Sequence, residues 1–258
     1  MKKLLTIELN KLRNFRAFWV LTGMYFIGLS ATLLTIQGII TSFANNPMDF
    51  LSFDTFPEVW HYLGYIGGYF HYILAVIVII LICSEFNYKT VRQNIITGLS
   101  RTEWMLGKFQ LMVFFALCST LIYFLCTMAV GLINTEGTEL GLMMSKAHFV
   151  FAFFIQTLVY LMLAILIGMI VRNTGIAIGI FMIYSWIIEK VIIWKLPDEI
   201  AQFFPLQASN DMIQWPFLNE ILAMSRQDGP NWTAIVISIA WIGIFYFLGH
   251  LYLKKKDI

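Results

Sequence analysis

Residues 84–108 read SEFNYKTVRQNIITGLSRTEWMLGK, a polar and basic stretch between two long apolar runs at 62–83 and 109–133. Each run has about the 20 residues that an α-helix needs to cross a hydrocarbon core. A patterned polar segment held between two such runs predicts a polytopic membrane protein in which this loop has a structure of its own.

The composition of the whole chain supports this prediction. Of the 258 residues, 59% are hydrophobic and 12% are charged, whereas a soluble domain carries about a quarter charged residues. Six apolar runs are long enough for helices, since barrel strands would alternate over about 10 residues. We predict an all-α fold, a single transmembrane domain over residues 1–258 with spans near 17–40, 62–83, 109–133, 149–171, 174–194 and 232–253. Because Glu189-Lys190 interrupts the fifth run, this span either continues to residue 194 or ends near 188.

Basic residues are concentrated in alternate loops. The N-terminal segment, the 85–108 loop, Arg172 and the C-terminal tail hold most of the 17 Lys and Arg residues. The positive-inside rule then predicts that both termini and the 85–108 loop are cytoplasmic. The first apolar run is too long for the core of a signal peptide, and no small-residue cleavage site follows it, so we expect an uncleaved first span.

The polar stretch contains signals for two helices. Its apolar residues recur on one face of a short helix, at Val91, Ile95, Ile96 and Leu99. Gly98 is placed to end that helix, and Ser100 with Glu103 forms a capping box that begins the next one. The alternative is a basic loop that only fixes topology, which would need no such stop and restart.

The N-terminal segment and two glycine pairs carry weaker patterns. Leucine and other apolar residues between Leu4 and Phe15 cluster on one helical face, broken by Glu8, Lys11 and Arg16. This predicts an amphipathic helix on the inner leaflet, with a plain basic flank as the alternative. The pairs Gly64/Gly68 and Gly175/Gly179 have GxxxG spacing, which is typical of close helix packing or a dimer face but also arises by chance.

The 85–108 segment resembles a signature of type-2 (ABC-2-like) permease subunits of ABC transporters. These proteins show Glu, then Thr-hydrophobe-Arg, then Ser-Arg, and Gly-Lys entering the third span. The matching residues here are Glu85, Thr90-Val91-Arg92, Ser100-Arg101 and Gly107-Lys108. The resemblance extends to the basic amphipathic start, the six spans and the long outer segment before the sixth. Many members have a proline before Ser-Arg, where this chain has Gly98-Leu99.

The resemblance implies a mechanism. In that family the loop after span two forms a coupling helix that docks in a groove of a separate ATP-binding subunit, and residues 88–99 would be that helix here. The residues implied in coupling are Lys89, Thr90, Val91, Arg92, Ile95, Ile96, Leu99 and Arg101. Glu85 would be a gate or structural residue at the membrane edge, and residues 195–231 would form short re-entrant helices at the exit.

The same resemblance implies the partners and the setting. The chain would lie in the bacterial inner (cytoplasmic) membrane with a second permease subunit, as a homodimer or a heterodimer, and would have no nucleic-acid partner. It contains no G-x-x-x-x-G-K-[ST] sequence, so it has no P-loop of its own. We therefore expect no enzyme activity, cofactor or metal in this chain, with ATP and Mg bound by the partner subunit.

Spans two and five would line the path of the cargo. Their aromatic and aliphatic residues suit a hydrophobic or amphipathic cargo such as a lipid, peptide or drug, although aromatic residues are also common at membrane interfaces. The candidate path residues are Tyr65, Tyr69, Tyr72, Met182 and Tyr184, with Phe70 and Trp186 beside them.

Two other classes of protein stay open on the sequence. An ion-coupled secondary carrier would need ionisable residues inside the membrane, and only Glu85, Glu189 and Lys190 come close, all near span ends. An integral membrane enzyme would need a nucleophile–base pair or a metal site. The four histidines are scattered, and Glu and His are not paired at helical spacing inside any span.

Overall fold

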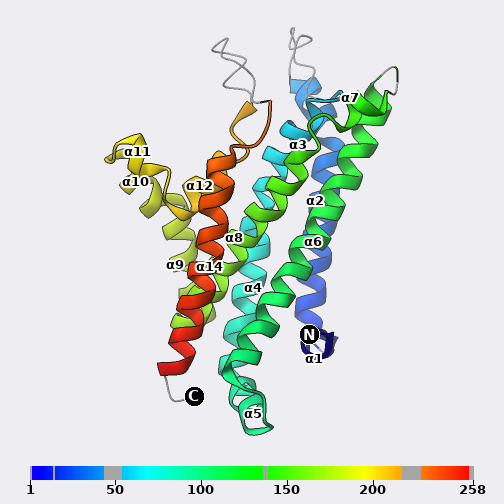
Figure 1. Ribbon diagram of the computed structural model, residues 1–258. Helices are drawn as coiled ribbons and strands as arrows, with labels where there is room; N and C mark the ends of the chain where they lie inside the picture. Colours follow the sequence, from blue (N-terminus) through cyan, green and yellow to red (C-terminus); the bar gives the residue numbers. More distant parts are fainter. Residues whose placement is uncertain are drawn as a thin grey trace.

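The computed structural model describes residues 2–13, 15–43, 54–135, 137, 139–216 and 228–255. Within these ranges the regular secondary structure is helical and no strand occurs. Long helices run side by side in an elongated bundle, with short helices at both ends (Figure 1). Six helical segments of the described chain are long and apolar enough to span a membrane, which confirms the all-α polytopic fold.

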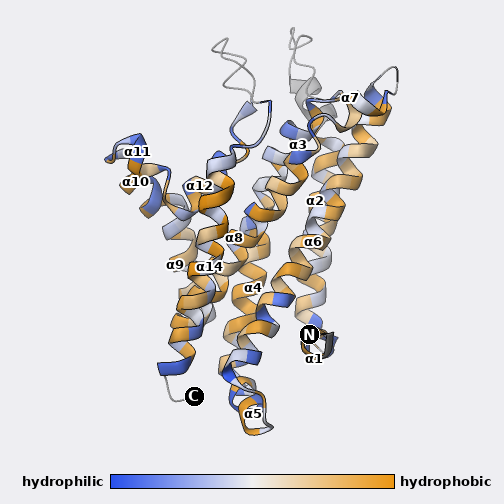
Figure 2. Ribbon diagram, viewed as in Figure 1, coloured by the Kyte–Doolittle hydropathy of each residue, from blue (hydrophilic) through white to orange (hydrophobic). Residues whose placement is uncertain are grey.

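The helical segments that could span a membrane cover the predicted runs, and the third begins at Arg101 instead of near residue 109. They are α2 (Arg16–Phe43), α3 with α4 (Val59–Gly68 and Phe70–Asn87), α6 (Arg101–Asn134), α8 (His148–Val171), α9 with η1 and α10 (Thr174–Ile183, Tyr184–Ile188 and Glu189–Trp194), and α14 (Trp232–Lys255). The short helices are α1 (Lys2–Arg13), α5 (Thr90–Ile96), α7 (Leu140–Met144), α11 (Asp198–Ala201) and α12 (Pro205–Asp211). Hydrophobic residues follow the length of the bundle, and hydrophilic ones gather at its ends (Figure 2).

Helix α8 is the centre of the bundle. It is apolar on all sides, as expected of a helix surrounded by others, and it packs against α3, α4, α6, α9, α12 and α14. Helices α2 and α14 instead keep large apolar side chains exposed, among them Met24, Ile27, Val236 and Phe247. A bilayer accommodates such a surface, whereas water would not.

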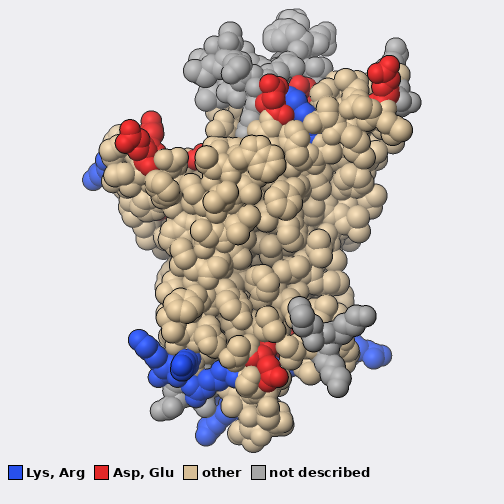
Figure 3. All heavy atoms as spheres, viewed as in Figure 1, with Lys and Arg blue, Asp and Glu red and all other residues tan. Residues whose placement is uncertain are grey.

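Basic residues predominate at one end of the bundle and acidic residues at the other (Figure 3). The exceptions include Glu103, which lies among the basic residues, and Lys146 and Lys195, which lie among the acidic ones. The end that carries α5 and the last turn of α14 holds Lys89, Arg92, Arg101, Arg172, Lys254 and Lys255; it is called the basic end below. The opposite end holds Asp54, Glu58, Glu139, Asp198, Glu199 and Asp228. Part of the predicted outer segments, residues 44–53 and 217–227, lies outside the described residues.

Span five is one continuous helical segment that reaches Trp194. It contains a π-helical turn at Tyr184–Ile188, and such a turn inserts an extra residue and shifts the side chains that follow. Directly after it, Glu189 is buried, and its Oε1 accepts the backbone N–H groups of Leu206 at 2.8 Å and Gln207 at 2.7 Å. Span five thereby holds the start of α12.

The two glycine pairs have different surroundings. A Cβ atom on Gly64 would lie 2.9 Å from the Tyr123 hydroxyl, and one on Gly68 would lie 3.7 Å from the Gln156 amide. This pair therefore packs against other helices of the same chain. A Cβ atom on Gly179 would meet no heavy atom within 4 Å, so that face of α9 is open.

We expect Gly64→Ala to destabilise the fold by about 1–3 kcal/mol, because the added methyl group overpacks the contact with Tyr123. Gly179→Ala is the matched control and should leave stability unchanged or slightly higher, since it adds a methyl group in open space within a helix. Thermal unfolding of the two purified variants measures the difference. Equal unfolding temperatures would contradict the packing role of Gly64.

Candidate functional site

Helix α5 lies at the extremity of the basic end (Figure 1) and has two sharply defined boundaries. Gly98 has φ +103°, and the N–H groups of Gly98 and Leu99 bond to the carbonyls of Ile95 at 3.1 Å and Asn94 at 3.0 Å. This is the Schellman arrangement, which favours glycine at the left-handed position.

The next helix, α6, begins at Arg101, with Ser100 as its N-cap residue. The Ser100 side chain accepts the Glu103 N–H at 3.2 Å, and the Glu103 carboxylate accepts the Ser100 N–H at 2.8 Å. The predicted end of one helix and start of the next are confirmed. Both N–H groups that a capping box satisfies are hydrogen-bonded here.

The apolar stripe of α5 divides into an anchoring part and an exposed part. Val91 is 1% exposed, and Ile95 and Leu99 are partly buried against the core of the same chain. Ile96 is 75% exposed. The first three residues therefore hold α5 on the bundle, and Ile96 is the member of the stripe that a partner could bind.

The polar residues predicted for coupling also differ in their roles. Lys89, in the left-handed conformation at φ 56°, and Arg92 are exposed cations. The Thr90 hydroxyl donates to the Glu85 carbonyl at 3.0 Å. The Arg101 guanidinium donates to the carbonyls of Leu253 at 2.9 Å and Lys254 at 2.8 Å. Arg101 thus ties the start of α6 to the end of α14, a contact within the chain that the sequence does not predict.

A group of four charges, three of them buried, lies at the base of α5. Lys108 of α6 has a fully buried side chain and forms ion pairs with Glu8 of α1 and Glu85 of α4. Glu8 also pairs with Lys11 at 2.6 Å. These four residues are called the ion cluster below, and their formal charges balance. The cluster joins α1, α4 and α6 at a place where an unpaired charge would be costly.

Sequence reasoning found Glu85 but missed its partners. In the sequence, Lys108 stands out only as part of the signature, and Glu8 only as a break in the apolar face of the N-terminal helix. The signal was present in that break: Glu8 is buried in the structure, so α1 packs on α6 through a face that includes a carboxylate.

The pKa of Glu8 gives a pH-dependent test of the ion cluster. Burial alone would raise this pKa, but the charges of Lys108 and Lys11 and their hydrogen bonds outweigh it and bring the pKa below its ordinary value of 4.5. The ionised carboxylate therefore stabilises the fold fully above about pH 4.5, and this contribution is lost as pH falls through the lowered folded-state pKa. We expect the wild type to lose more thermal stability than Glu8→Gln on acidification below about pH 4.5. Parallel pH profiles of the two proteins would contradict this assignment.

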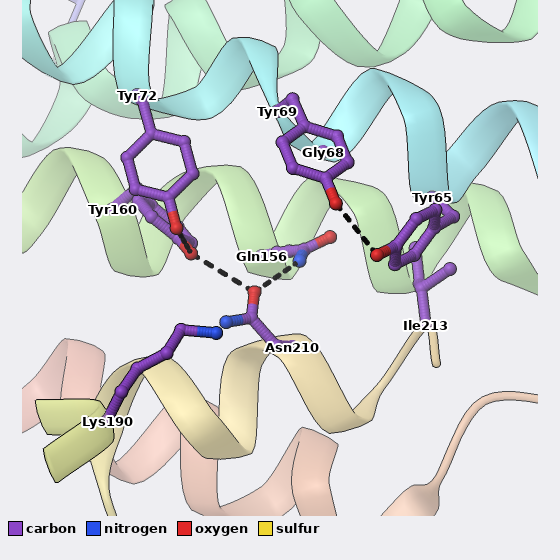
Figure 4. Close-up of a pocket in the computed structure, with 9 residues that line it drawn as sticks. All are labelled: Tyr65, Gly68, Tyr69, Tyr72, Gln156, Tyr160, Lys190, Asn210 and Ile213. Atoms are coloured by element: carbon purple, nitrogen blue, oxygen red, sulfur yellow. Dashed lines mark hydrogen bonds between the residues drawn. The ribbon is translucent and has the colours of Figure 1, made fainter. Parts of the chain in front are cut away.

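A second candidate site is a cavity of about 140 Å³ in the half of the bundle away from the basic end. It is called the polar cavity and is lined by Tyr65, Gly68, Tyr69, Tyr72, Gln156, Tyr160, Lys190, Asn210 and Ile213. Figure 4 shows these residues converging from α3, α4, α8 and α12, with Lys190 extending from α10 toward Asn210.

Hydrogen bonds connect most of the polar groups around the cavity. Asn210 Oδ1 accepts from the Tyr160 hydroxyl at 3.1 Å and from Gln156 Nε2 at 3.2 Å. The Tyr72 and Tyr160 hydroxyls lie 3.2 Å apart, and those of Tyr65 and Tyr69 lie 2.8 Å apart. Because Tyr72 and Tyr160 lie near the middle of their spans, the cavity reaches toward the centre of the bundle.

The structure brings together three of the five predicted path residues. Tyr65, Tyr69 and Tyr72 line the polar cavity, whereas Met182 and Tyr184 are not among its lining residues. Gln156, Tyr160 and Asn210 were missed because they come from α8 and α12, and their contact with α4 depends on helix packing. Within the described residues, no group of three or more His, Cys, Asp or Glu residues could hold a metal ion.

These features define a multi-pass, all-α membrane protein. It carries the short polar helix α5 at its basic end and a polar cavity in its other half. The chain belongs to the DUF2705 family, described as a protein of unknown function, whose family model matches residues 19–258. That match includes α5, Glu85, Lys108 and the whole lining of the cavity. No curated protein matches the chain.

Proposed function

We propose that this protein is the membrane-spanning permease subunit of an ATP-binding-cassette exporter, driven by ATP that a separate subunit hydrolyses. The observation that carries the proposal is α5. It is a short helix with two defined ends, anchored by Val91, that presents Ile96 and the cations Lys89 and Arg92 at the extremity of the molecule. A soluble partner that drives transport needs a rigid element to push on. A helix fixed to the bundle passes a movement of the partner to the transmembrane helices, whereas a flexible loop would absorb it.

The connections of α5 indicate how that displacement would spread. Thr90 bonds to the last turns of α4, and the ion cluster fastens α4 to α6 and α1. Helix α4 then runs about 20 Å from Glu85 to Tyr72, which lines the polar cavity. A movement imposed on α5 would reach the cavity through this single helix.

The proposal includes an orientation and partners. The basic end faces the cytoplasm by the positive-inside rule, so both termini are cytoplasmic. The resemblance to ABC-2-like permeases favours the bacterial inner membrane. The ATP-binding subunit carries ATP and Mg and docks on α5, and a second permease subunit completes the transporter. A cargo that is hydrophobic or amphipathic fits the aromatic lining of the polar cavity.

Reconstitution tests this function. The chain is co-expressed with an ATP-binding subunit of the same organism, chosen by its association with the chain, and the purified complex is placed in liposomes. We expect ATPase activity of the complex to exceed that of the soluble subunit alone, and an environment-sensitive lipid probe to cross the membrane only with ATP. The proposal would be refuted if no such subunit associated with the chain. It would also be refuted if the probe crossed the membrane equally fast without ATP.

An ion-coupled secondary carrier is the second candidate. The observation in its favour is that Lys108, Glu8 and Glu85 are buried near the end of the spans, and ionisable residues in such positions often mark ion pathways. The same liposomes distinguish the two candidates: a carrier would move the probe when a pH gradient is imposed without ATP.

A further inference from the structure

We infer that the polar cavity holds the anionic head group of an amphiphile, and that Lys190 selects the charge of this head group. The inference rests on the proposed export function and narrows its cargo. It follows from three observations: the chemistry of the lining, the environment of Lys190, and the apolar surface beside the cavity.

The lining offers hydrogen bonds and a single charge. Four tyrosine hydroxyls and the amides of Gln156 and Asn210 supply neutral donors and acceptors. Lys190 is the one charged residue in the lining. An ammonium group donates hydrogen bonds and accepts none, so the full set favours a ligand rich in acceptor oxygens, as a phosphate or sulfate group is.

The charge of Lys190 is not neutralised by a salt bridge in the described ranges, where every ion pair found involves other residues. The neighbouring Glu189 is buried, and its Oε1 accepts the backbone N–H groups of Leu206 and Gln207. Its charge also interacts with that of Lys190, although the two side chains form no salt bridge within the described ranges. Two adjacent charges therefore follow the π-helical turn. Glu189 holds α12, whereas Lys190 is an exposed residue that also lines the cavity.

An apolar surface adjoins the cavity. Trp186 on the π-helical turn is 62% exposed, and its ring lies 5.9 Å from that of Tyr72, edge to face. Ile183 and Ile187 on the same segment are also exposed. A lipid-like tail could follow these residues along span five while its head group occupies the cavity. The volume of about 140 Å³ accommodates several water molecules or one phosphate-sized group.

Direct binding tests the inference without the ATP-binding subunit. The full chain is placed in nanodiscs of phosphatidylcholine and titrated with radiolabelled dodecyl phosphate, with protein-free discs as background. Dodecyltrimethylammonium has the same tail and the opposite charge. We expect saturable binding of the phosphate and none of the ammonium compound, and Lys190→Gln should weaken phosphate binding about tenfold through loss of a charge-assisted hydrogen bond.

Lys195→Gln is the matched control, because Lys195 is an exposed lysine at the end of the same helix and outside the cavity lining. It should bind dodecyl phosphate like the wild type, and Lys190→Arg should retain most of the binding. The inference would be overturned by equal binding of both amphiphiles or by the absence of saturable binding. It would also be overturned if Lys190→Gln bound dodecyl phosphate as tightly as the wild type. Displacement by millimolar inorganic phosphate would also overturn it, since the ligand would then be a soluble anion. None of these outcomes bears on docking of the ATP-binding subunit at α5.

Discussion

Lys108→Met is expected to destabilise the protein by about 3–5 kcal/mol, the usual cost of removing one partner from a buried ion pair. The substitution keeps an unbranched side chain only one heavy atom shorter and removes its charge. Glu8 and Glu85 would then be buried without the cation that both contact. Denaturant or SDS titration of the purified variant, followed by circular dichroism, measures the loss.

Two comparisons separate this effect from a general loss of packing. Lys11→Met removes a cation that also pairs with Glu8 but is partly exposed, so it should cost at most about 1 kcal/mol. The triple variant Glu8→Gln, Lys108→Met, Glu85→Gln removes the three buried charges and leaves only the partly exposed Lys11. It should recover much of the stability lost in Lys108→Met. If the Lys11 and Lys108 variants were equally stable, the ion cluster would not be the feature that joins α1, α4 and α6.

Ile96→Asp is expected to weaken association with the ATP-binding subunit by more than about 30-fold, the effect of losing a central interface residue worth about 2 kcal/mol. The aspartate would replace the exposed apolar side chain that α5 offers to the partner with a charged one. Stability of the isolated chain should stay unchanged, because Ile96 is 75% exposed. Co-purification and stimulated ATPase activity are the measurements.

The matched control is Leu140→Asp, which introduces the same charge at a residue that is 76% exposed on α7, at the opposite end of the bundle. It should leave association intact. Val91→Asp serves as the contrasting variant, since Val91 is buried and its replacement should lower stability as well as association. Full association of Ile96→Asp with the ATP-binding subunit would remove α5 as the docking element and with it the main support for the proposed function.

The sequence predicts helix ends correctly where residues close together in the chain determine them. Gly98 ends α5 through its positive φ, and Ser100 with Glu103 begins α6 by capping, because both devices act over three or four residues. The six apolar runs likewise became spans, since the length of an apolar run is set by the thickness of the bilayer and not by its neighbours.

The assembly of the candidate sites required the tertiary structure. Glu8 and Lys108 are 100 residues apart in the chain, and Gln156 and Asn210 are 54 apart. In an apolar helix exposed to lipid on one side and to other helices on the other, hydropathy alone does not show which face is buried. The sequence alone determined the helices, their ends and the sorting of charge. Packing around α8 decided which polar side chains meet, because a buried charge or amide is tolerated only where another helix brings its partner.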